Sequence, residues 1–351
     1  MRALVIEAPD RFSLAEVAQP SAARGDVVIE VLAGGICGTD VEILHGDMVY
    51  YTRGAAAYPV IPCHEWTGVV RALGEGVSHI AIGDRVVGEV SIGCLSCPVC
   101  LSGNYHRCAD RTETGIMNRP GGFSERMVLP AAFVHKIASS VSLGSAALVE
   151  PTAVAYNGVL KAGVSPSDDV VIFGDGPIGL LLLQIVRLFG ARKIAMVGAA
   201  DSRLEIARKS GADAVIDARA GDIAGSVCRA FGGGRGSIVF EASGHPDAIM
   251  TALDVASPGA RLVLQGFCGG RRIDGFNVDP IIVNDLTVIG ALGSPRIWPE
   301  VIRLIEDGRL NPSAVITDVL PVSAFGEAIR RVEHREACKV ILRTDLPRAW
   351  G

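Results

Sequence analysis

A glycine-rich run between an apolar strand and an apolar helix constrains this chain more than any other feature. Asp169-Val-Val-Ile-Phe173 is typical of a buried β-strand, Gly174-Asp-Gly-Pro-Ile-Gly179 follows it directly, and a helix is expected from Leu180 to Phe189. In a G-x-G-x-x-G run the glycines permit a tight turn, close approach to a pyrophosphate, and close packing of helix on strand. The run predicts a doubly wound parallel sheet that binds a dinucleotide. The residues expected at the pyrophosphate are Gly174, Gly176, Pro177, Ile178 and Gly179.

The pattern of apolar and turn-forming residues changes twice along the chain. Residues 1–152 hold short β-branched runs cut by Gly, Pro and Asp, residues 153–292 alternate strands with helices, and residues 293–351 return to the first style. With 351 residues, two domains are expected. An inserted domain leaves its two termini close together. The order therefore predicts an α/β protein in which a split, β-rich catalytic domain surrounds a Rossmann domain at 153–292.

Several elements are expected at particular places. Residues 194–197 and 214–216 are predicted strands of the parallel sheet, and residues 203–209 a helix between them. In the last segment we expect helices at 299–306 and 324–332 and a strand at 339–342.

Composition and charge exclude several classes of protein. The net charge of -5 offers no electrostatic reason to bind nucleic acid or anionic lipid. The N-terminal Met1–Glu7 lacks the basic and apolar regions of a signal peptide, and the most apolar stretch, Ile178–Val186, is too short to span a bilayer. We therefore expect a cytoplasmic protein that binds small molecules, without nucleic-acid or membrane partners.

The nine cysteines indicate metal binding. Without a secretory signal they argue against a disulfide framework, and four of them crowd into one short segment. Cys94, Cys97, Cys100 and Cys108 have the spacing to close a tetrahedron of four thiolates around a structural zinc. An iron–sulfur cluster is the competing interpretation. A nucleic-acid zinc ribbon is set aside because few basic side chains lie nearby.

The end of the second predicted strand bears on the coenzyme preference. The acidic residue that accepts a ribose hydroxyl bond in NAD-binding sheets should stand about twenty residues beyond the fingerprint, and that position is Gly198. Arg203, followed by Arg208 and Lys209, could supply positive charge to a 2'-phosphate, although solvated helix charges are an equal interpretation. We therefore expect NAD or NADP, with a slight preference for NADP. Asp201 could nevertheless support the binding of NAD.

Three further motifs are dispersed along the chain. They are Gly34-Gly-Ile-Cys-Gly-Thr-Asp40, Pro62-Cys-His-Glu-Trp66 and Val149-Glu-Pro-Thr152. Composition alone would make Cys37 a core thiol and His64 an ordinary buried histidine. With the four-cysteine lobe and the glycine run, however, their order resembles that of the zinc-containing medium-chain dehydrogenases, in the branch of sorbitol and threonine dehydrogenases. This resemblance spans nearly the whole chain and implies a GroES-like catalytic domain.

The resemblance implies a second, catalytic zinc. Its ligands would be Cys37 and His64, with Glu65 and Glu150 completing the sphere directly or through water. Which glutamate binds is left open. His64 and Glu65 are adjacent and would face opposite ways on a regular strand, so both reach one metal only if the backbone turns there.

A proton must also leave the site. Thr39 matches the hydroxyl residue that begins the proton relay in the family. Where relatives often have a histidine, this chain has Glu42, which leaves Glu42, His45 or solvent to take the proton. Asp40 is interpreted as structural, hydrogen-bonded to nearby backbone.

The segment after the first metal motif is where relatives form part of the substrate pocket. Tyr50, Tyr51 and Arg53 are therefore candidate substrate contacts, with an exposed loop as the alternative. Cysteines outside the two metal sets are interpreted as packing residues: Cys63, Cys228, Cys268 and Cys338.

The resemblance, with the residues that carry it, implies a zinc-dependent oxidoreductase with two zincs per chain. It would transfer a hydride between NAD(P) and a secondary alcohol or ketone of a polyol, cyclitol, amino-cyclitol, sugar or hydroxy amino acid. The resemblance also implies a homodimer or homotetramer. A zinc-independent NADPH reductase of the same fold and a non-enzymatic nucleotide-binding sensor are the alternatives.

Overall fold

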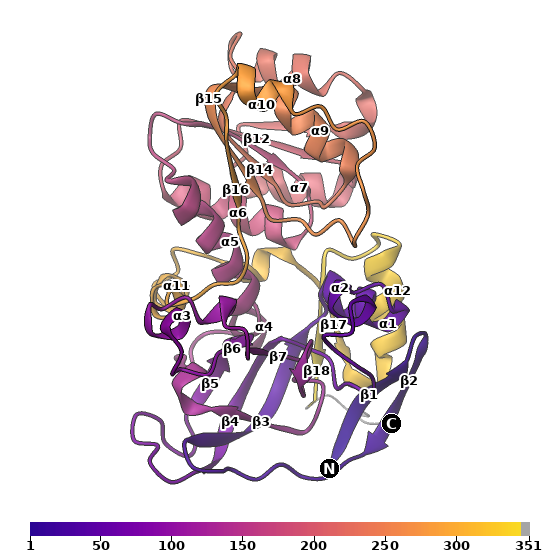
Figure 1. Cartoon of the computed structure of the whole chain (residues 1–351), viewed down its shortest axis with the longest axis vertical. Helices are drawn as coiled ribbons and strands as arrows, with labels where there is room; N and C mark the ends of the chain where they lie inside the picture. Colours follow the sequence, from indigo (N-terminus) through magenta and orange to yellow (C-terminus); the bar gives the residue numbers. More distant parts are fainter. Residues whose placement is uncertain (345–351) are drawn as a thin grey trace. The chain divides into compact units, whose positions relative to one another are not determined.

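The computed structural model describes residues 1–344, which divide into two compact units (Figure 1). Residues 1–150 and 293 onward form the first unit, and residues 151–292 form the second. The first is rich in strands, and the second is built on a parallel sheet with helices. The predicted fold class is confirmed.

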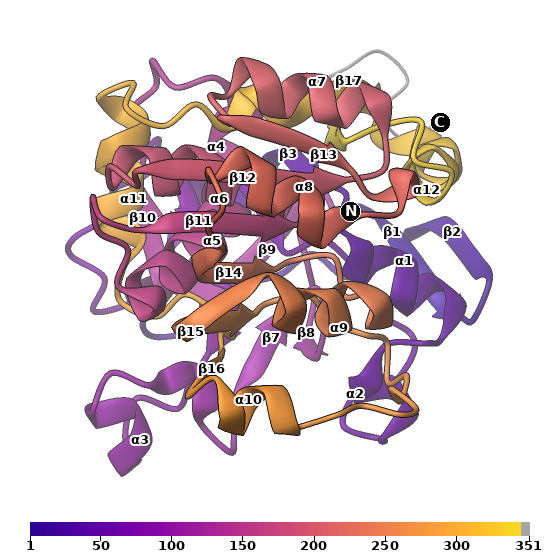
Figure 2. The same cartoon turned by 90° about the horizontal axis from the view of Figure 1, so that it is seen from above.

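The second unit contains a six-stranded parallel sheet in the order β13-β12-β11-β14-β15-β16, which Figure 2 shows side by side. Every residue of the central strand β11 is buried, as expected where both faces of a sheet are covered. The strands are β11 (Asp169–Phe173), β12 (Lys193–Gly198), β13 (Ala214–Asp217), β14 (Gly236–Glu241), β15 (Ala256–Leu264) and β16 (Thr287–Gly290).

Helices cover both faces of this sheet. Because side chains alternate along a strand, Val171 and Phe173 of β11 point to one face, where they join Val227 and Leu253 in an apolar cluster. Val227 and Leu253 lie on α8 and α9, which leaves the other face to α6 and α7. The helices are α5 (Val149–Ala162), α6 (Pro177–Leu188), α7 (Asp201–Lys209), α8 (Ile223–Ala230), α9 (Pro246–Val255) and α10 (Asp279–Val283).

The main sheet of the first unit joins segments from both ends of the chain. Its order is β10-β5-β4-β3-β18-β17, with β9 also paired to β3. Strand β18 runs antiparallel to β3, so Ile341 lies opposite Gly35. The C-terminal strand therefore lies beside the end of β3. The strands are β3 (Asp26–Gly35), β4 (Glu65–Leu73), β5 (Arg85–Gly88), β9 (Arg126–Pro130), β10 (Val134–Lys136), β17 (Ile316–Pro321) and β18 (Lys339–Arg343).

Smaller elements surround this sheet. Strands β1 (Arg2–Ala8) and β2 (Arg11–Glu16) form a hairpin, and β6 (Ser91–Ile92), β7 (Thr112–Thr114) and β8 (Asn118–Arg119) form a three-stranded sheet. Within residues 1–344 the structure holds no helix with the length and apolar character that crossing a bilayer requires. The helices of this unit are α1 (Gly38–His45), α2 (Val49–Thr52), α3 (Pro98–Leu101), α4 (Leu143–Ala147), α11 (Trp298–Glu306) and α12 (Phe325–Glu333).

Candidate metal centres and coenzyme loop

Three predicted metal ligands of the first unit come together. Cys37 ends the segment after β3, while His64 and Glu65 stand where β4 begins, and one ligand atom from each lies within 4.8 Å of the others. Cys63 has a positive φ of 84°, so the backbone turns immediately before His64. That turn allows the adjacent His64 and Glu65 to face one point, which a regular strand would prevent.

Asp40 fixes the two strand ends relative to each other. Its carboxylate is fully buried and accepts hydrogen bonds from the backbone amides of Cys37 (2.9 Å) and Cys63 (3.1 Å). The expected hydrogen bonds between Asp40 and nearby backbone are confirmed. Because each amide belongs to or precedes a metal-motif residue, Asp40 sets the spacing of Cys37 and His64.

A buried ion pair holds Glu65, and the sequence did not reveal it. The ammonium of Lys339 lies 2.8 and 2.9 Å from the two carboxylate oxygens of Glu65 and donates to the carbonyl of Ile36. Lys339 and Glu65 are 2% and 1% exposed. A Cβ at Gly35 would lie 2.2 Å from the Glu65 carboxylate, so only glycine leaves room for it. The available signal was a charged residue at the start of the apolar strand 339–342.

The charges of this pocket suit a cation. Burial raises the pKa of Glu150 to about 7, against the opposing effect of nearby His64. The buried carboxyl groups of Asp40 and Glu150 thus lie near His64 and Cys37, while Lys339 supplies a positive charge beside Glu65.

An imidazole nitrogen without a hydrogen-bond partner also indicates that a cation can bind here. Nδ1 of His64 is buried and finds no hydrogen-bond partner among residues 1–344. Thiolate, imidazole and carboxylate are the donors that zinc prefers. The compact set of donors includes Glu65 but not Glu150, whose oxygen is not grouped with the other three.

The three candidates for proton transfer have different surroundings. Thr39 lies in the first turn of α1, with its hydroxyl 3.9 Å from the Cys37 sulfur, and half-buried Glu42 follows one turn later. The ring of His45, in contrast, is held between the surface carboxylates of Asp10 and Glu333. We therefore do not assign His45 to proton transfer.

The segment after α1 supplies polar groups near the metal motif. The guanidinium of Arg111 donates to the Tyr50 hydroxyl (3.3 Å) and pairs with the buried carboxylate of Glu113 (2.8 Å). Tyr51 donates to a backbone carbonyl at residue 116, whereas Arg53 is exposed. The sequence did not single out Arg111 or Glu113, because no local pattern marks them.

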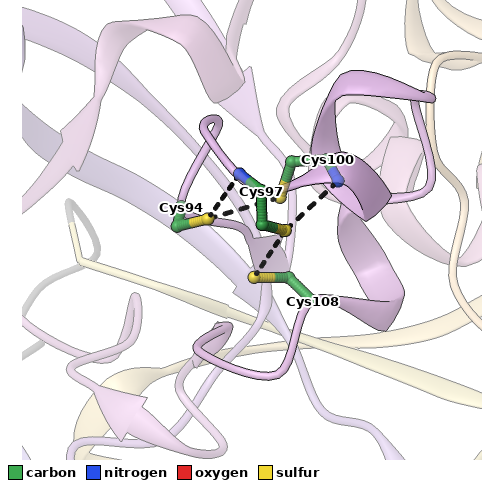
Figure 3. Close-up of side chains that lie close together, drawn as sticks. All are labelled: Cys94, Cys97, Cys100 and Cys108. Carbon is green, nitrogen blue, oxygen red and sulfur yellow. Dashed lines mark hydrogen bonds between the residues drawn. The ribbon is translucent and has the colours of Figure 1, made fainter.

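The four cysteines of the lobe surround one point (Figure 3). The sulfurs of Cys94 and Cys100 are 3.8 Å apart, as are those of Cys97 and Cys108. Four sulfurs at about 2.3 Å from one zinc form a tetrahedron with edges of about 3.8 Å. These separations fit a single ion and are too long for disulfides. A hydrogen bond from Ser96 helps to lower the pKa of Cys94 to about 6, which favours the thiolate.

The glycine loop of the second unit fits a pyrophosphate. Gly174 has a φ of 106°, and a Cβ at Gly179 would lie 1.8 Å from the Gly174 carbonyl oxygen, so both positions require glycine. No atom lies within 4 Å of a Cβ at Gly176, which leaves open space at the N-terminus of α6. The helix begins at Pro177, three residues before the predicted start, because Pro is preorganised for the first helical position.

The end of strand β12 lies beside a carboxylate that the sequence analysis did not place there. Gly198 closes β12, and the side chain of Asp175, from the glycine loop, lies against it. Arg203 is buried in α7. Asp175 stands at a variable position of the G-x-G-x-x-G run, where the sequence gives no signal of its own.

These two units, with a thiolate–imidazole–carboxylate cluster and a four-cysteine lobe, define the class of zinc-containing dehydrogenases. Two family models match: the alcohol dehydrogenase GroES-like domain over residues 23–139 and the zinc-binding dehydrogenase over residues 177–307. The chain belongs to the zinc-binding dehydrogenase family, in its polyol dehydrogenase branch.

Named relatives extend over almost the whole chain. An erythritol/L-threitol dehydrogenase of Mycolicibacterium smegmatis is 33% identical over 356 residues, 97% of each chain. A sorbitol dehydrogenase of Halalkalibacterium halodurans is 30% identical over 334 residues, 94% of this chain and 95% of that one.

Solved structures of relatives contain both coenzymes. The rspB alcohol dehydrogenase of Escherichia coli, complexed with NADH, has a TM-score of 0.88 at 30% identity and covers 98% of this chain and 99% of its own. A zinc-binding dehydrogenase of Sinorhizobium meliloti bound to NADP has a TM-score of 0.89 at 28% identity, covering 97% and 98%. The comparisons thus support NAD(P)-dependent alcohol oxidoreduction without choosing the coenzyme.

Proposed function

We propose that this protein is a zinc-dependent dehydrogenase that moves a hydride between NAD(P) and a secondary alcohol or ketone of a small polar substrate. One observation carries the proposal: ligand atoms of Cys37, His64 and Glu65 lie within 4.8 Å of one another in a chain that also has the coenzyme loop. A zinc-independent reductase would have no use for this buried set of donors.

Cys37 and His64 are proposed as direct ligands of a catalytic zinc. Glu65, whose two oxygens also contact Lys339, or Glu150 is proposed to complete the sphere, directly or through water. Bound zinc would polarise the substrate hydroxyl and lower its pKa, which favours loss of its proton before the hydride leaves. The four cysteines of the lobe would hold the second, structural zinc.

Thr39 and Glu42 are proposed to carry the proton away. The Thr39 hydroxyl adjoins the Cys37 sulfur, and Glu42 lies three residues further on the same helix face. The hydroxyl accepts the proton of the substrate while passing its own towards Glu42 and solvent. Oxidation of one alcohol thus yields one ketone, one hydride on the coenzyme and one released proton.

Polar side chains support a hydroxylated substrate. Tyr50, Arg111 and Glu113 form a connected group, and Glu113 contributes to the field at Glu150. A Cβ at Gly115, which follows Glu113 by two residues, would lie 2.5 Å from the carbonyl oxygen of Cys63, so this segment packs against the metal motif. Such a group suits polyols, cyclitols, amino-cyclitols, sugars or hydroxy amino acids, and the relatives named for erythritol and sorbitol agree with this class.

We further propose assembly as a homodimer or homotetramer. Apolar side chains on α10 and on the edge strand β16 are exposed, among them Ile282 (73%), Val283 (81%) and Val288 (41%). An exposed apolar patch beside an open sheet edge is typical of an interface, and a second copy of the chain would cover it.

Zinc per chain, measured by elemental analysis, tests the function first. We expect two zincs in the wild type, one in Cys37→Ser, and two in the control Cys228→Ser, whose thiol lies outside both clusters. NADH and NADPH titrations on the same samples should show unchanged coenzyme binding. One zinc in both the wild type and Cys37→Ser would contradict the catalytic metal and favour the zinc-independent reductase.

A further inference from the structure

We propose that Asp175 of the glycine loop recognises the 2'-hydroxyl of the adenosine ribose and makes this enzyme specific for NAD. The inference rests on the proposed nicotinamide-dependent function and narrows its coenzyme. It reverses the slight preference for NADP drawn from the sequence, where the absence of an acid at position 198 left the ribose without a partner.

The Asp175 carboxylate reaches the end of the second strand. The residue is 8% exposed, and its Oδ2 accepts hydrogen bonds from the backbone amides of Ala199 and Ala200, each at 2.7 Å. These are the first two amides after β12. The carboxylate therefore lies where the side chain that ends this strand would be found in a dinucleotide-binding sheet.

Gly198 and Asp175 are complementary in shape. A Cβ at residue 198 would lie 2.5 Å from both the Cβ and Oδ2 of Asp175, a separation that no real side chain could keep. The space of a strand-terminal side chain is thus filled by a carboxylate from the neighbouring loop. The acid expected at position 198 is supplied from position 175.

One oxygen of this carboxylate stays available. Among residues 1–344 the Oδ1 of Asp175 accepts no hydrogen bond, although the side chain is more than nine-tenths buried. The neighbouring Gly176 faces open space at the start of α6, where a pyrophosphate would bind. A ribose joined to that pyrophosphate would present its hydroxyls to Oδ1, and ribose hydroxyls are the donors that such a carboxylate accepts.

A 2'-phosphate would meet a negative environment here. The two amides after β12 already donate to Asp175, so they are not free to bind phosphate oxygens. Asp217 lies beside Gly198 on the adjacent strand, and together with Asp201 it engages Arg219. Two carboxylates therefore already engage this exposed guanidinium, and Asp175 adds a third negative charge at the end of β12.

The remaining cations of this region are either buried or paired with another side chain. Arg203 is 8% exposed and packs into the unit from α7. Arg208 and Lys209 lie near the other end of α7 and pair with Glu205 at 3.2 and 3.7 Å. Arg208 and Lys209 are thus paired with Glu205, and the Arg203 side chain is buried.

Coenzyme titrations on the wild-type protein, followed by fluorescence, give the first test. We expect NADH to bind at least about tenfold more tightly than NADPH, as follows from one charged hydrogen bond gained or lost. NADH whose adenosine ribose lacks the 2'-hydroxyl should bind about tenfold more weakly than NADH. Tighter binding of NADPH, or equal binding of NADH and its 2'-deoxy analogue, would overturn the inference without any variant.

The variant Asp175→Asn tests the residue itself. Its amide oxygen can still accept from the two backbone amides, but the negative charge is lost. We expect the ratio of the NADPH and NADH dissociation constants to fall by about tenfold or more. Asp201→Asn is the matched control, since Asp201 is a nearby carboxylate that faces Arg219 and solvent, and its ratio should stay close to that of the wild type.

Each outcome is decisive. An unchanged ratio in folded Asp175→Asn would overturn the assignment, and a fall seen only in Asp201→Asn would move it to that residue. Thermal unfolding verifies the fold, and if Asp175→Asn does not fold, the wild-type titrations decide alone. Binding of neither coenzyme would instead reject the proposed function, so the two failures can be distinguished.

Discussion

At the scale of single residues, the metal pocket depends on a lysine that no motif contains. Glu65 would be a buried, unpaired carboxylate without Lys339, which arrives from the far end of the chain. A buried charge without its partner is costly in free energy, so removal of one member of the pair leaves the other in an unfavourable environment.

Removal of this lysine should therefore destabilise the protein strongly. We expect Lys339→Met to lower the free energy of unfolding by about 3–5 kcal/mol, because Glu65 keeps its burial but loses its cation. Lys339→Arg should retain part of the stability, and the surface control Lys136→Met, which breaks an exposed pair with Asp84, should change it by less than about 1 kcal/mol. Denaturant unfolding measures all three, and equal values for Lys339→Met and the control would contradict a structural ion pair.

His45 should make stability depend on pH. Hydrogen bonds to Asp10 and Glu333 raise the pKa of His45 above its ordinary value. A raised folded-state pKa contributes stability below the unfolded value, near 6.5, and loses it as the pH rises through the folded value. Because the ring is partly exposed, the contribution should stay below about 1 kcal/mol.

The comparison of wild type with His45→Gln checks this sign. The wild type should exceed the variant in melting temperature at pH 6, and the difference should shrink as the pH rises through the folded-state pKa of His45. A difference that stays constant or grows with pH would show that the ring acts through packing and not through its charge.

At the scale of elements, a buried hydrogen-bond chain anchors the four-cysteine lobe. The hydroxyl of Tyr105, within the lobe, donates to Glu89 (2.5 Å) and accepts from the backbone amide of Arg296 (2.8 Å). The other oxygen of Glu89 contacts the ring of His135 (2.9 Å), which stacks on Trp298. The lobe is thus joined to β10 and to the segment before α11.

Tyr105→Phe should loosen this anchor. Without the hydroxyl, Glu89 and the Arg296 amide lose a buried partner, which should cost about 1–3 kcal/mol of unfolding free energy. We also expect faster release of one zinc per chain to a chelator, while the zinc that depends on Cys37 is retained. Unchanged stability and release would mean that water replaces the hydroxyl at no cost.

At the scale of the whole molecule, the exposed apolar patch on α10 and β16 predicts self-association. Charges introduced by the double variant Ile282→Glu, Val283→Glu should convert the oligomer into smaller species, because a carboxylate buried in an apolar interface lacks a partner. Light scattering after size exclusion measures the mass. The control Val319→Glu changes an apolar side chain, 50% exposed, on β17 of the first unit and should leave the oligomer intact. A monomeric wild type would contradict the proposed assembly.

The sequence by itself determined the features that depend on local spacing. The glycine fingerprint lies between strand and helix as expected, and the four cysteines meet because short loops can close only around one point. Most element types were predictable for the same reason, since hydrophobic period and turn residues act over a few positions. The fold class and the family followed from the order of these motifs.

Only the tertiary structure decided which distant residues complete the sites. Lys339 meets Glu65 across 274 positions because β18 pairs with β3, and no local pattern encodes that pairing. Asp175 meets Ala200 across 25 positions because β11 and β12 are neighbours in the sheet, so their following loops adjoin. Strand pairing sets such contacts, and it depends on burial summed over the whole chain and not on any short segment.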